Sequence, residues 1–227
     1  MKRVTVLLCA VWCAVSPLAA GMNDDPVYVT AVLDRLETTD AGEHPLVWEG
    51  RLSVGDAWNK ISFYSEGEAL HGDVEESENA LVYSRAVTPY WDFQAGIAWD
   101  TLDGEHQRWA LLAAEGMAPY FVEARAELLL GEDGNVGLRL SAEYEAYLTQ
   151  FLVLVPSLEA SAYTRDTSET ALGSGFSSLR AGVRLCYEIR RDFSPYVGVE
   201  WEKHYGRTGR YDPLDRAVAV AGLRFWF

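Results

Sequence analysis

The sequence predicts an all-β protein, an antiparallel up-and-down transmembrane β-barrel of about twelve strands. Three observations support this fold class: an N-terminal secretory signal, long segments in which apolar and polar residues alternate, and a last alternating segment that ends on Phe227. Alternation over roughly ten residues matches strands that cross a bilayer at a tilt, with one face toward lipid and the other toward the lumen.

The N-terminus has the parts of a signal peptide. Lys2 and Arg3 supply positive charge, residues 4–15 form an apolar run, and small residues follow at the expected processing point. The run is shorter than the roughly 20 residues that a membrane-spanning helix requires. We therefore expect residues 1–21 to be removed, and residues 22–227 to form one outer-membrane barrel domain with a short N-terminal periplasmic segment.

Composition and motifs argue against several classes of protein. The chain has a formal net charge of −15 at pH 7, whereas binding to nucleic acid needs a basic surface. Cys186 is the single cysteine beyond the signal peptide, so no intramolecular disulfide is expected. The sequence has no G-x-S-x-G, H-E-x-x-H or C-x-x-C motif, and no histidine lies within a predicted strand beside a lipid-facing serine. We therefore expect neither an enzyme nor a nucleic-acid-binding protein.

Period-two alternation identifies the strands. Between residues 179 and 189 every second position is apolar, and Arg180, Arg184 and Glu188 are among the residues between them. A strand places such charges on one face, whereas a helix would distribute them around its circumference. The same pattern recurs in three further segments, residues 60–66, 138–145 and 196–202.

Turn signals divide the mature chain into twelve strands. Short turns are expected at residues 55–56, 88–89, 117–119, 149–150 and 192–195. Longer polar loops are expected at residues 38–45, 70–75, 102–108, 131–135, 165–178 and 206–213. An even number of strands places both termini on the periplasmic side, with the short turns there and the longer loops outside.

The charged face of each strand is expected to point into the lumen, because all spanning backbone groups must pair and the sheet must therefore close. The predicted lumen-facing charged residues are Glu49, Arg51, Lys60, Glu66, Glu123, Arg125, Glu127, Arg139, Glu143, Glu145, Glu159, Arg180, Arg184, Glu188, Arg190, Glu200, Glu202, Arg216 and Arg224. Two interpretations stay open. The charges either pair with one another and plug the lumen, or their surplus of carboxylates lines a path for cations.

The last strand carries an assembly signal. Phe227, Phe225 and Leu223 end an apolar alternation that begins with alanines at 217, 219 and 221. The residues between these positions are Trp226, Arg224, Gly222, Val220, Val218 and, before the first alanine, Arg216. A strand that ends on a C-terminal phenylalanine is typical of barrels that the barrel-assembly machinery inserts into the outer membrane. That machinery and outer-membrane lipid are therefore expected partners.

Candidate metal ligands lie in the predicted outer loops. His44, His71, His106 and His204 are all in or near such loops, several of them beside carboxylates, and Met22 follows the processing point. Imidazole and carboxylate donors suit copper or zinc. These five residues are the candidate metal site, and ordinary solvated loop histidines are the alternative.

Four segments resemble the copper resistance protein B family: "NALVYSRAVTPYWDFQAGIAWD", "EGMAPYFVEARAELLLGEDG", "GSGFSSLRAGVRLCYEIRRDFSPYVGVEW" and "VAGLRFWF". The resemblance runs from about Asp25 to Phe227. It implies an outer-membrane barrel of a copper-resistance system that binds copper ions, with periplasmic copper proteins as further partners. The Met- and His-rich segment that members carry before the first strand is reduced here to residues 21–24.

The expected function is therefore to bind copper ions, to help export or exclude them, or both. The alternative is a narrow outer-membrane channel or structural barrel without metal selectivity. Equilibrium copper binding discriminates between them.

Overall fold

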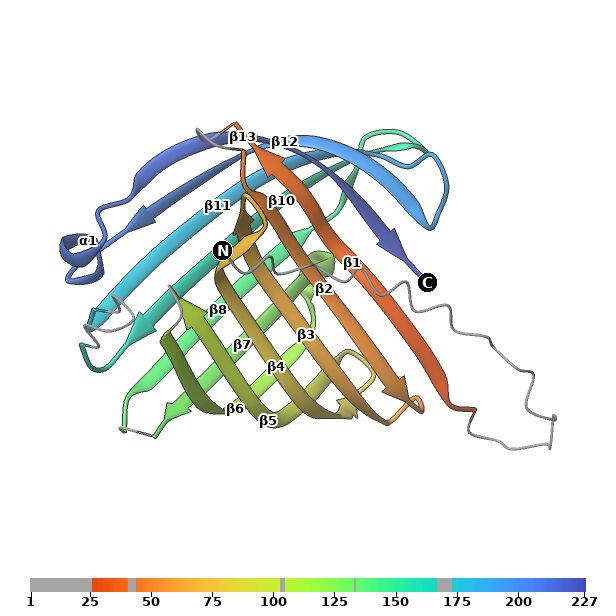
Figure 1. Ribbon diagram of the computed structural model, residues 1–227. Coiled ribbons are helices and arrows are strands. Elements are labelled where there is room, and N and C mark those ends of the chain that lie inside the picture. Colours follow the sequence, from red (N-terminus) through yellow and green to blue (C-terminus); the bar gives the residue numbers. More distant parts are fainter. Residues whose placement is uncertain (1–25, 41–43, 103–104, 133, 167–172) are drawn as a thin grey trace.

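The computed structural model describes residues 26–40, 44–102, 105–132, 134–166 and 173–227 (Figure 1). The expected signal peptide and Met22 lie outside the described residues.

One antiparallel sheet makes up the molecule. Its strands are β1 (Tyr28–Thr39), β2 (Leu46–Gly55), β3 (Asn59–Leu70), β4 (Asp73–Thr88), β5 (Trp91–Leu102), β6 (Glu105–Ala118), β7 (Val122–Gly131), β8 (Val136–Tyr144), β9 (Ala146–Tyr147), β10 (Leu152–Tyr163), β11 (Gly175–Tyr187), β12 (Phe193–His204) and β13 (Asp215–Trp226). β9 continues β8 beyond Glu145, because both pair with β10 in one unbroken register. The sheet is thus a twelve-stranded barrel, as predicted.

The barrel closes between the first and last strands. Each strand pairs with its neighbours in sequence, and β13 returns to β1 with Val32 opposite Trp226 and Thr39 opposite Val220. Figure 1 shows β1 in orange beside β13 in dark blue. Closure leaves no sheet edge, so the strands' backbone groups are paired within the sheet.

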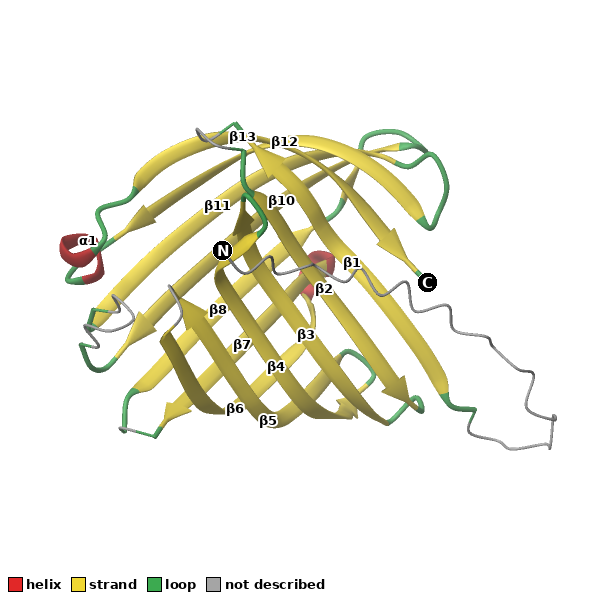
Figure 2. Cartoon of the chain, viewed as in Figure 1, coloured by secondary structure: helices red, strands yellow, loops and turns green. Residues whose placement is uncertain are grey.

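Two short helical segments complete the described structure (Figure 2). They are η1 (Pro119–Phe121), between β6 and β7, and α1 (Thr208–Tyr211), between β12 and β13. Among the described residues, no helix is long and apolar enough to cross a bilayer.

The outer face of the barrel is apolar. Residues at alternate positions on the strands are large, apolar and exposed, and Ile97 in the middle of β5 has 57% of its surface accessible. The other members of this surface include Leu52, Ile61, Leu81, Leu112, Leu128, Leu138, Val183 and Val199. An apolar exterior of this kind is suited to hydrocarbon rather than to water.

Part of the interior is a packed apolar core. Trp109, Leu111, Leu129 and Tyr163 are buried in one cluster inside the wall formed by β4 to β8 and β10. The Trp109 and Tyr163 rings lie 6.0 Å apart. These apolar side chains therefore fill part of the lumen, and charged side chains of the same strands, such as Asp100 and Arg139, lie directly beside them.

Four predicted connections differ from the structure. In the loop expected at residues 165–178, residues 175–178 already belong to β11. Residues 70–75 and 102–108 belong largely to strands, and only His71 and Gly72 separate β3 from β4. Their polarity suggested loops, but strands that extend past the membrane can carry polar residues in water. The turn expected at residues 192–195 lies earlier in the chain, because residues 193–195 are the first residues of β12.

A β-bulge interrupts β1. The register of β1 against β2 shifts between Leu33 and Arg35. Asp34 and Arg35, which are consecutive, therefore both line the interior. A bulge places two residues opposite one and moves the following side chains to the other face.

Candidate functional site: the charged lumen

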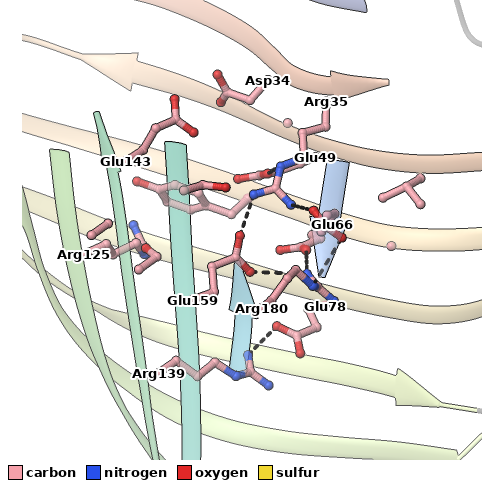
Figure 3. A pocket seen from close by; sticks show the side chains of 18 of the residues that line it. Asp34, Arg35, Glu49, Glu66, Glu78, Arg125, Arg139, Glu143, Glu159 and Arg180 are labelled. Atoms are coloured by element: carbon pink, nitrogen blue, oxygen red, sulfur yellow. Dashed lines mark hydrogen bonds and ion pairs between the residues drawn. The ribbon is translucent and has the colours of Figure 1, made fainter. Parts of the chain in front are cut away.

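The lumen contains a cavity of about 790 Å³. Sixteen carboxylates and eight arginines line it, so acidic groups outnumber basic ones two to one. Figure 3 shows these side chains converging from opposite walls of the barrel.

The structure places most of the predicted lumen residues on this cavity, namely Glu49, Arg51, Glu66, Glu123, Arg125, Glu127, Arg139, Glu143, Glu145, Glu159, Arg180, Arg184, Glu188, Glu200, Glu202, Arg216 and Arg224. Lys60 is not among its lining residues and instead forms an ion pair with Asp92, Nζ to Oδ2 2.6 Å. The lumen placement of Arg190 is wrong. β11 ends at Tyr187, and the Arg190 side chain, 74% exposed, pairs with Asp192 in the following turn.

One wall carries an uninterrupted row of carboxylates. In the register of β2 to β5, Glu49 lies opposite Glu66, Glu66 opposite Glu78, and Glu78 opposite Asp100. Like charges directly opposite one another destabilise a sheet. These four residues are called the acid row below, and other groups must compensate their charge.

The facing wall alternates in sign. From β10 to β13, Glu159 lies opposite Arg180, Arg180 opposite Glu202, and Glu202 opposite Arg216. Cross-strand pairs of opposite charge favour the sheet. The two walls therefore differ in charge pattern, although all of these residues except Asp100 line the same cavity.

Arg180 reaches across the lumen to the acid row (Figure 3). Its Nη1 lies 3.1 Å from Glu66 on β3 and 3.3 Å from Glu159, and its Nη2 lies 3.3 Å from Glu202. β11 and β3 are far apart around the barrel. This arginine therefore bridges nearly opposite walls.

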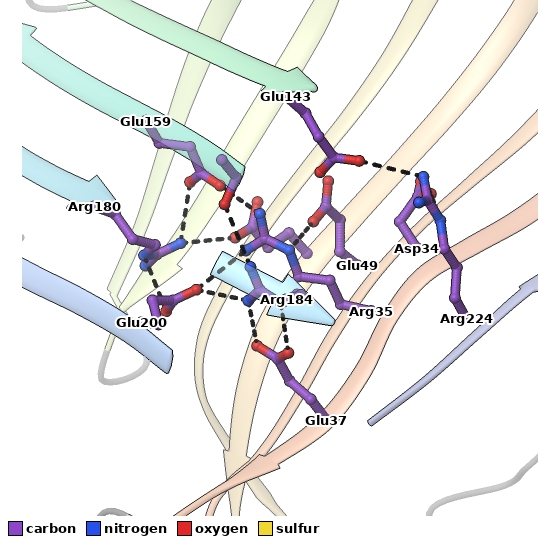
Figure 4. A network of polar contacts seen from close by, with 12 residues as sticks. Asp34, Arg35, Glu37, Glu49, Glu143, Glu159, Arg180, Arg184, Glu200 and Arg224 are labelled. Carbon is purple, nitrogen blue, oxygen red and sulfur yellow. Dashed lines mark hydrogen bonds and ion pairs between the residues drawn. The ribbon is translucent and has the colours of Figure 1, made fainter. Parts of the chain in front are cut away.

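Arg35 forms the second bridge (Figure 4). Its Nε lies 2.8 Å from Glu49 on the neighbouring strand, and its Nη2 lies 2.5 Å from Glu159 on β10. Because Glu159 accepts from both Arg35 and Arg180, the two guanidinium groups are joined in one network.

Arg139 covers the other end of the acid row. Nη1 lies 2.6 Å from Glu78 and Nη2 lies 2.8 Å from Asp100. The indole of Trp109 donates to the same Asp100 oxygen at 2.8 Å, which ties the charged network to the apolar core.

Two further networks cross the lumen. Glu115 on β6 accepts from Arg51 and Arg125, both at 2.5 Å, and from the Tyr64 hydroxyl at 2.7 Å. Arg224 on β13 lies within 3.4 Å of three carboxylates, Asp34, Glu143 and Glu145. Figure 4 shows Arg224 beside two of these, Asp34 and Glu143.

All four candidate histidines lie at the end of the barrel opposite Phe227. His44 is hydrogen-bonded to the Thr39 carbonyl at 2.9 Å, and His106 to the Thr101 hydroxyl at 3.0 Å. His71 is in the turn between β3 and β4, with a φ of 52°. Each of these three is at or near a different connection between strands.

His204 is the histidine that lines the cavity. Its Nδ1 lies 3.3 Å from the Asp212 carboxylate, and its Nε2 lies 3.7 Å from Glu202. Within the part of the chain that the structure describes, no three His, Cys, Asp or Glu side chains are arranged as a metal site. The loop histidines therefore do not form a preassembled centre among the described residues.

Sequence reasoning missed several network members: Arg35, Glu37, Glu78, Asp100 and Glu115. The bulge explains why Arg35 and Glu37 were missed. Strict alternation along β1 would place both on the outer face, whereas the bulge moves them to the interior. The other three follow the ordinary alternation of β4, β5 and β6, so a full assignment of those strands would have found them.

The predicted assembly residues lie on the closing strand. The Phe225 ring packs against the Phe193 ring at a tilt of 35°, with ring centroids 4.9 Å apart, and Leu223 pairs with Pro195. The Phe227 N–H donates to the Ala31 carbonyl at 2.7 Å. The C-terminus is thus part of the seam that closes the barrel.

Comparisons of sequence place the chain among known proteins. The sequence pattern of the family described as "Copper resistance protein B precursor (CopB)" matches residues 27–227. "Copper resistance protein B" of Escherichia coli is 34% identical over 213 residues, 91% of this chain and 72% of the relative. "Copper resistance protein B homolog" of Pseudomonas syringae pv. tomato is 34% identical over 212 residues, with the same coverage.

Comparisons of structure support the fold. The NanC porin aligns with a TM-score of 0.52 and 13% identity, covering 87% of this chain and 99% of the porin. The KdgM porin aligns with a TM-score of 0.50 and 14% identity, covering 88% and 99%. At such low identity the likeness extends to the barrel fold alone.

Proposed function

Because the chain belongs to the copper resistance protein B family, we propose that it binds copper ions at the loop end of its barrel and thereby helps to exclude or export them. The chain is an outer-membrane barrel of a copper-resistance family. The observation that carries the proposal is the acidic lumen, whose surplus of carboxylates attracts cations toward His204 at its mouth.

The donors at this end suit Cu(II). Imidazole and carboxylate oxygen are ligands for Cu(II), whereas Cu(I) favours thioethers and thiolates. Met117, the methionine among the described residues, lies at the opposite end of the barrel, on β6 just before η1. His204, with Glu202 and Asp212 beside it, would hold the ion after exchanging its present contacts for metal bonds.

The alternative is a barrel without metal selectivity, and the ion pairs that cross the lumen favour it. Six network arginines, Arg35, Arg51, Arg139, Arg180, Arg184 and Arg224, contact carboxylates on strands that are not their neighbours. A lumen crossed by these ion pairs resists the passage of a hydrated ion. A purely structural barrel would need these ion pairs and no metal site.

Equilibrium titration of the purified, refolded barrel with Cu(II) tests the proposal, with Zn(II) and Ca(II) as controls. We expect saturable Cu(II) binding that exceeds the binding of Ca(II), because imidazole is a poor ligand for hard cations. The variant His44→Ala, His71→Ala, His106→Ala, His204→Ala should lose this binding while its barrel stays folded.

Two results would contradict the proposal. Equal weak binding of all three cations by the wild-type barrel would favour the structural alternative. Unchanged Cu(II) affinity in the quadruple variant would exclude the loop histidines as ligands. His204→Ala alone shows whether the histidine on the cavity carries most of the affinity.

A further inference from the structure

We propose that the lumen is a path for small monovalent cations and that three arginines keep this path closed. The guanidinium groups of Arg35, Arg139 and Arg180 occupy the acid row of Glu49, Glu66, Glu78 and Asp100 in place of mobile cations. This activity is separate from copper binding. It follows from the contrast between the two walls of the cavity.

The acid row requires cations. The four carboxylates lie opposite one another on neighbouring strands and therefore repel one another, and the row itself contains no basic residue. Each of them has a guanidinium within 3.1 Å, supplied by Arg35 for Glu49, by Arg180 for Glu66, and by Arg139 for the last two. The three arginines thus stand where mobile cations would otherwise be held.

The same three side chains obstruct the lumen. Arg180 joins β11 to β3, Arg139 joins β8 to β4 and β5, and Arg35 joins β2 to β10 through Glu49 and Glu159. Figure 3 shows these bridges spanning the space between the walls. An ion that follows the cavity meets them before it reaches the other end.

The unbridged part of the cavity selects for positive charge. Glu68 and Glu76 are cross-strand partners on the cavity beyond the acid row, toward the loop end. Among the described residues, neither has an ion-pair partner within 4.0 Å. Their negative potential concentrates cations at this entrance and repels anions.

Single-channel recording in planar bilayers with KCl tests the proposal on the mature barrel. Wild type should be closed or nearly so. Arg180→Gln and the double variant Arg139→Gln, Arg180→Gln should conduct, with at least a severalfold increase in open current, because each substitution removes a bridge and exposes carboxylates. In a KCl gradient the reversal potential should move toward that of K⁺.

Arg190→Gln is the matched control, because this arginine lies in an exposed turn and should leave the channel closed. Adding Glu66→Gln to Arg180→Gln should weaken cation selectivity without closing the path. The double variant Arg180→Gln, Glu66→Gln also removes both charges of the Arg180–Glu66 ion pair. It therefore replaces Arg180→Gln in the recordings if the single variant fails to fold.

The proposal is overturned if the folded double variants are as silent as wild type, or if the opened path prefers Cl⁻. Heat-modifiable electrophoretic mobility establishes folding in each case. Copper titration is a separate measurement, so a silent variant that still binds Cu(II) contradicts this inference and leaves the proposed function intact.

Discussion

Arg184 on β11 holds Glu37 on β1 in a two-point ion pair. Its Nη2 donates to Oε1 at 2.8 Å and its Nε donates to Oε2 at 3.1 Å, while the Tyr196 hydroxyl donates to Oε2 at 2.9 Å. The two side chains are 6% and 1% exposed. The pair connects strands on either side of the β13–β1 seam, so it reinforces the place where the barrel closes.

Arg184→Met should destabilise the barrel by about 3–5 kcal/mol, because it leaves the buried Glu37 carboxylate without a cationic partner. Unfolding by denaturant in lipid or detergent measures the effect. Adding Glu37→Gln removes the stranded charge and should restore much of the loss. A double variant no more stable than Arg184→Met would show that the cost comes from packing rather than from charge.

Ile97→Arg should destabilise the folded state by roughly 2–4 kcal/mol if residue 97 lies near the bilayer midplane, because its guanidinium would meet hydrocarbon. Ile97 is in the middle of β5, between Leu81 and Ala110 on the neighbouring strands, and faces outward. Ile97→Leu is the control and should change stability little. Equal stability of the arginine variant would indicate that this face does not contact lipid.

Phe227→Asp should lower the amount of barrel in the outer membrane of cells severalfold, because the C-terminal apolar alternation is disrupted. The backbone pairing of residue 227 with Ala31 needs no particular side chain. Refolding of the purified variant into detergent should therefore be nearly normal. Normal surface levels in cells would contradict an assembly signal at this residue, whereas failed refolding would assign it a structural role.

Copper binding through the loop histidines should weaken as the medium is acidified, since imidazole must be neutral to coordinate a metal. Titrations at a series of pH values measure this dependence. Affinity that stays constant down to pH 5 would point to water-exposed carboxylates as the ligands, because carboxylates in water remain largely ionised there.

The sequence determined the fold class. Period-two alternation is a property of the local backbone, so the segments 179–189 and 196–202 identified their strands and the face of each charge. The strand count followed from turn residues. Polar strand ends such as residues 73–75 were mistaken for a loop, because beyond the membrane a strand and a loop are equally polar.

The sequence by itself also determined that the lumen is acidic, since charges excluded from the lipid face must lie inside. Only the tertiary structure decided which charges meet. The bulge between Leu33 and Arg35 turns Arg35 and Glu37 inward, and closure of the barrel brings Arg180 to Glu66, 114 residues away in the chain. Such contacts depend on strand register and on the distance across the barrel, neither of which is encoded in any short segment.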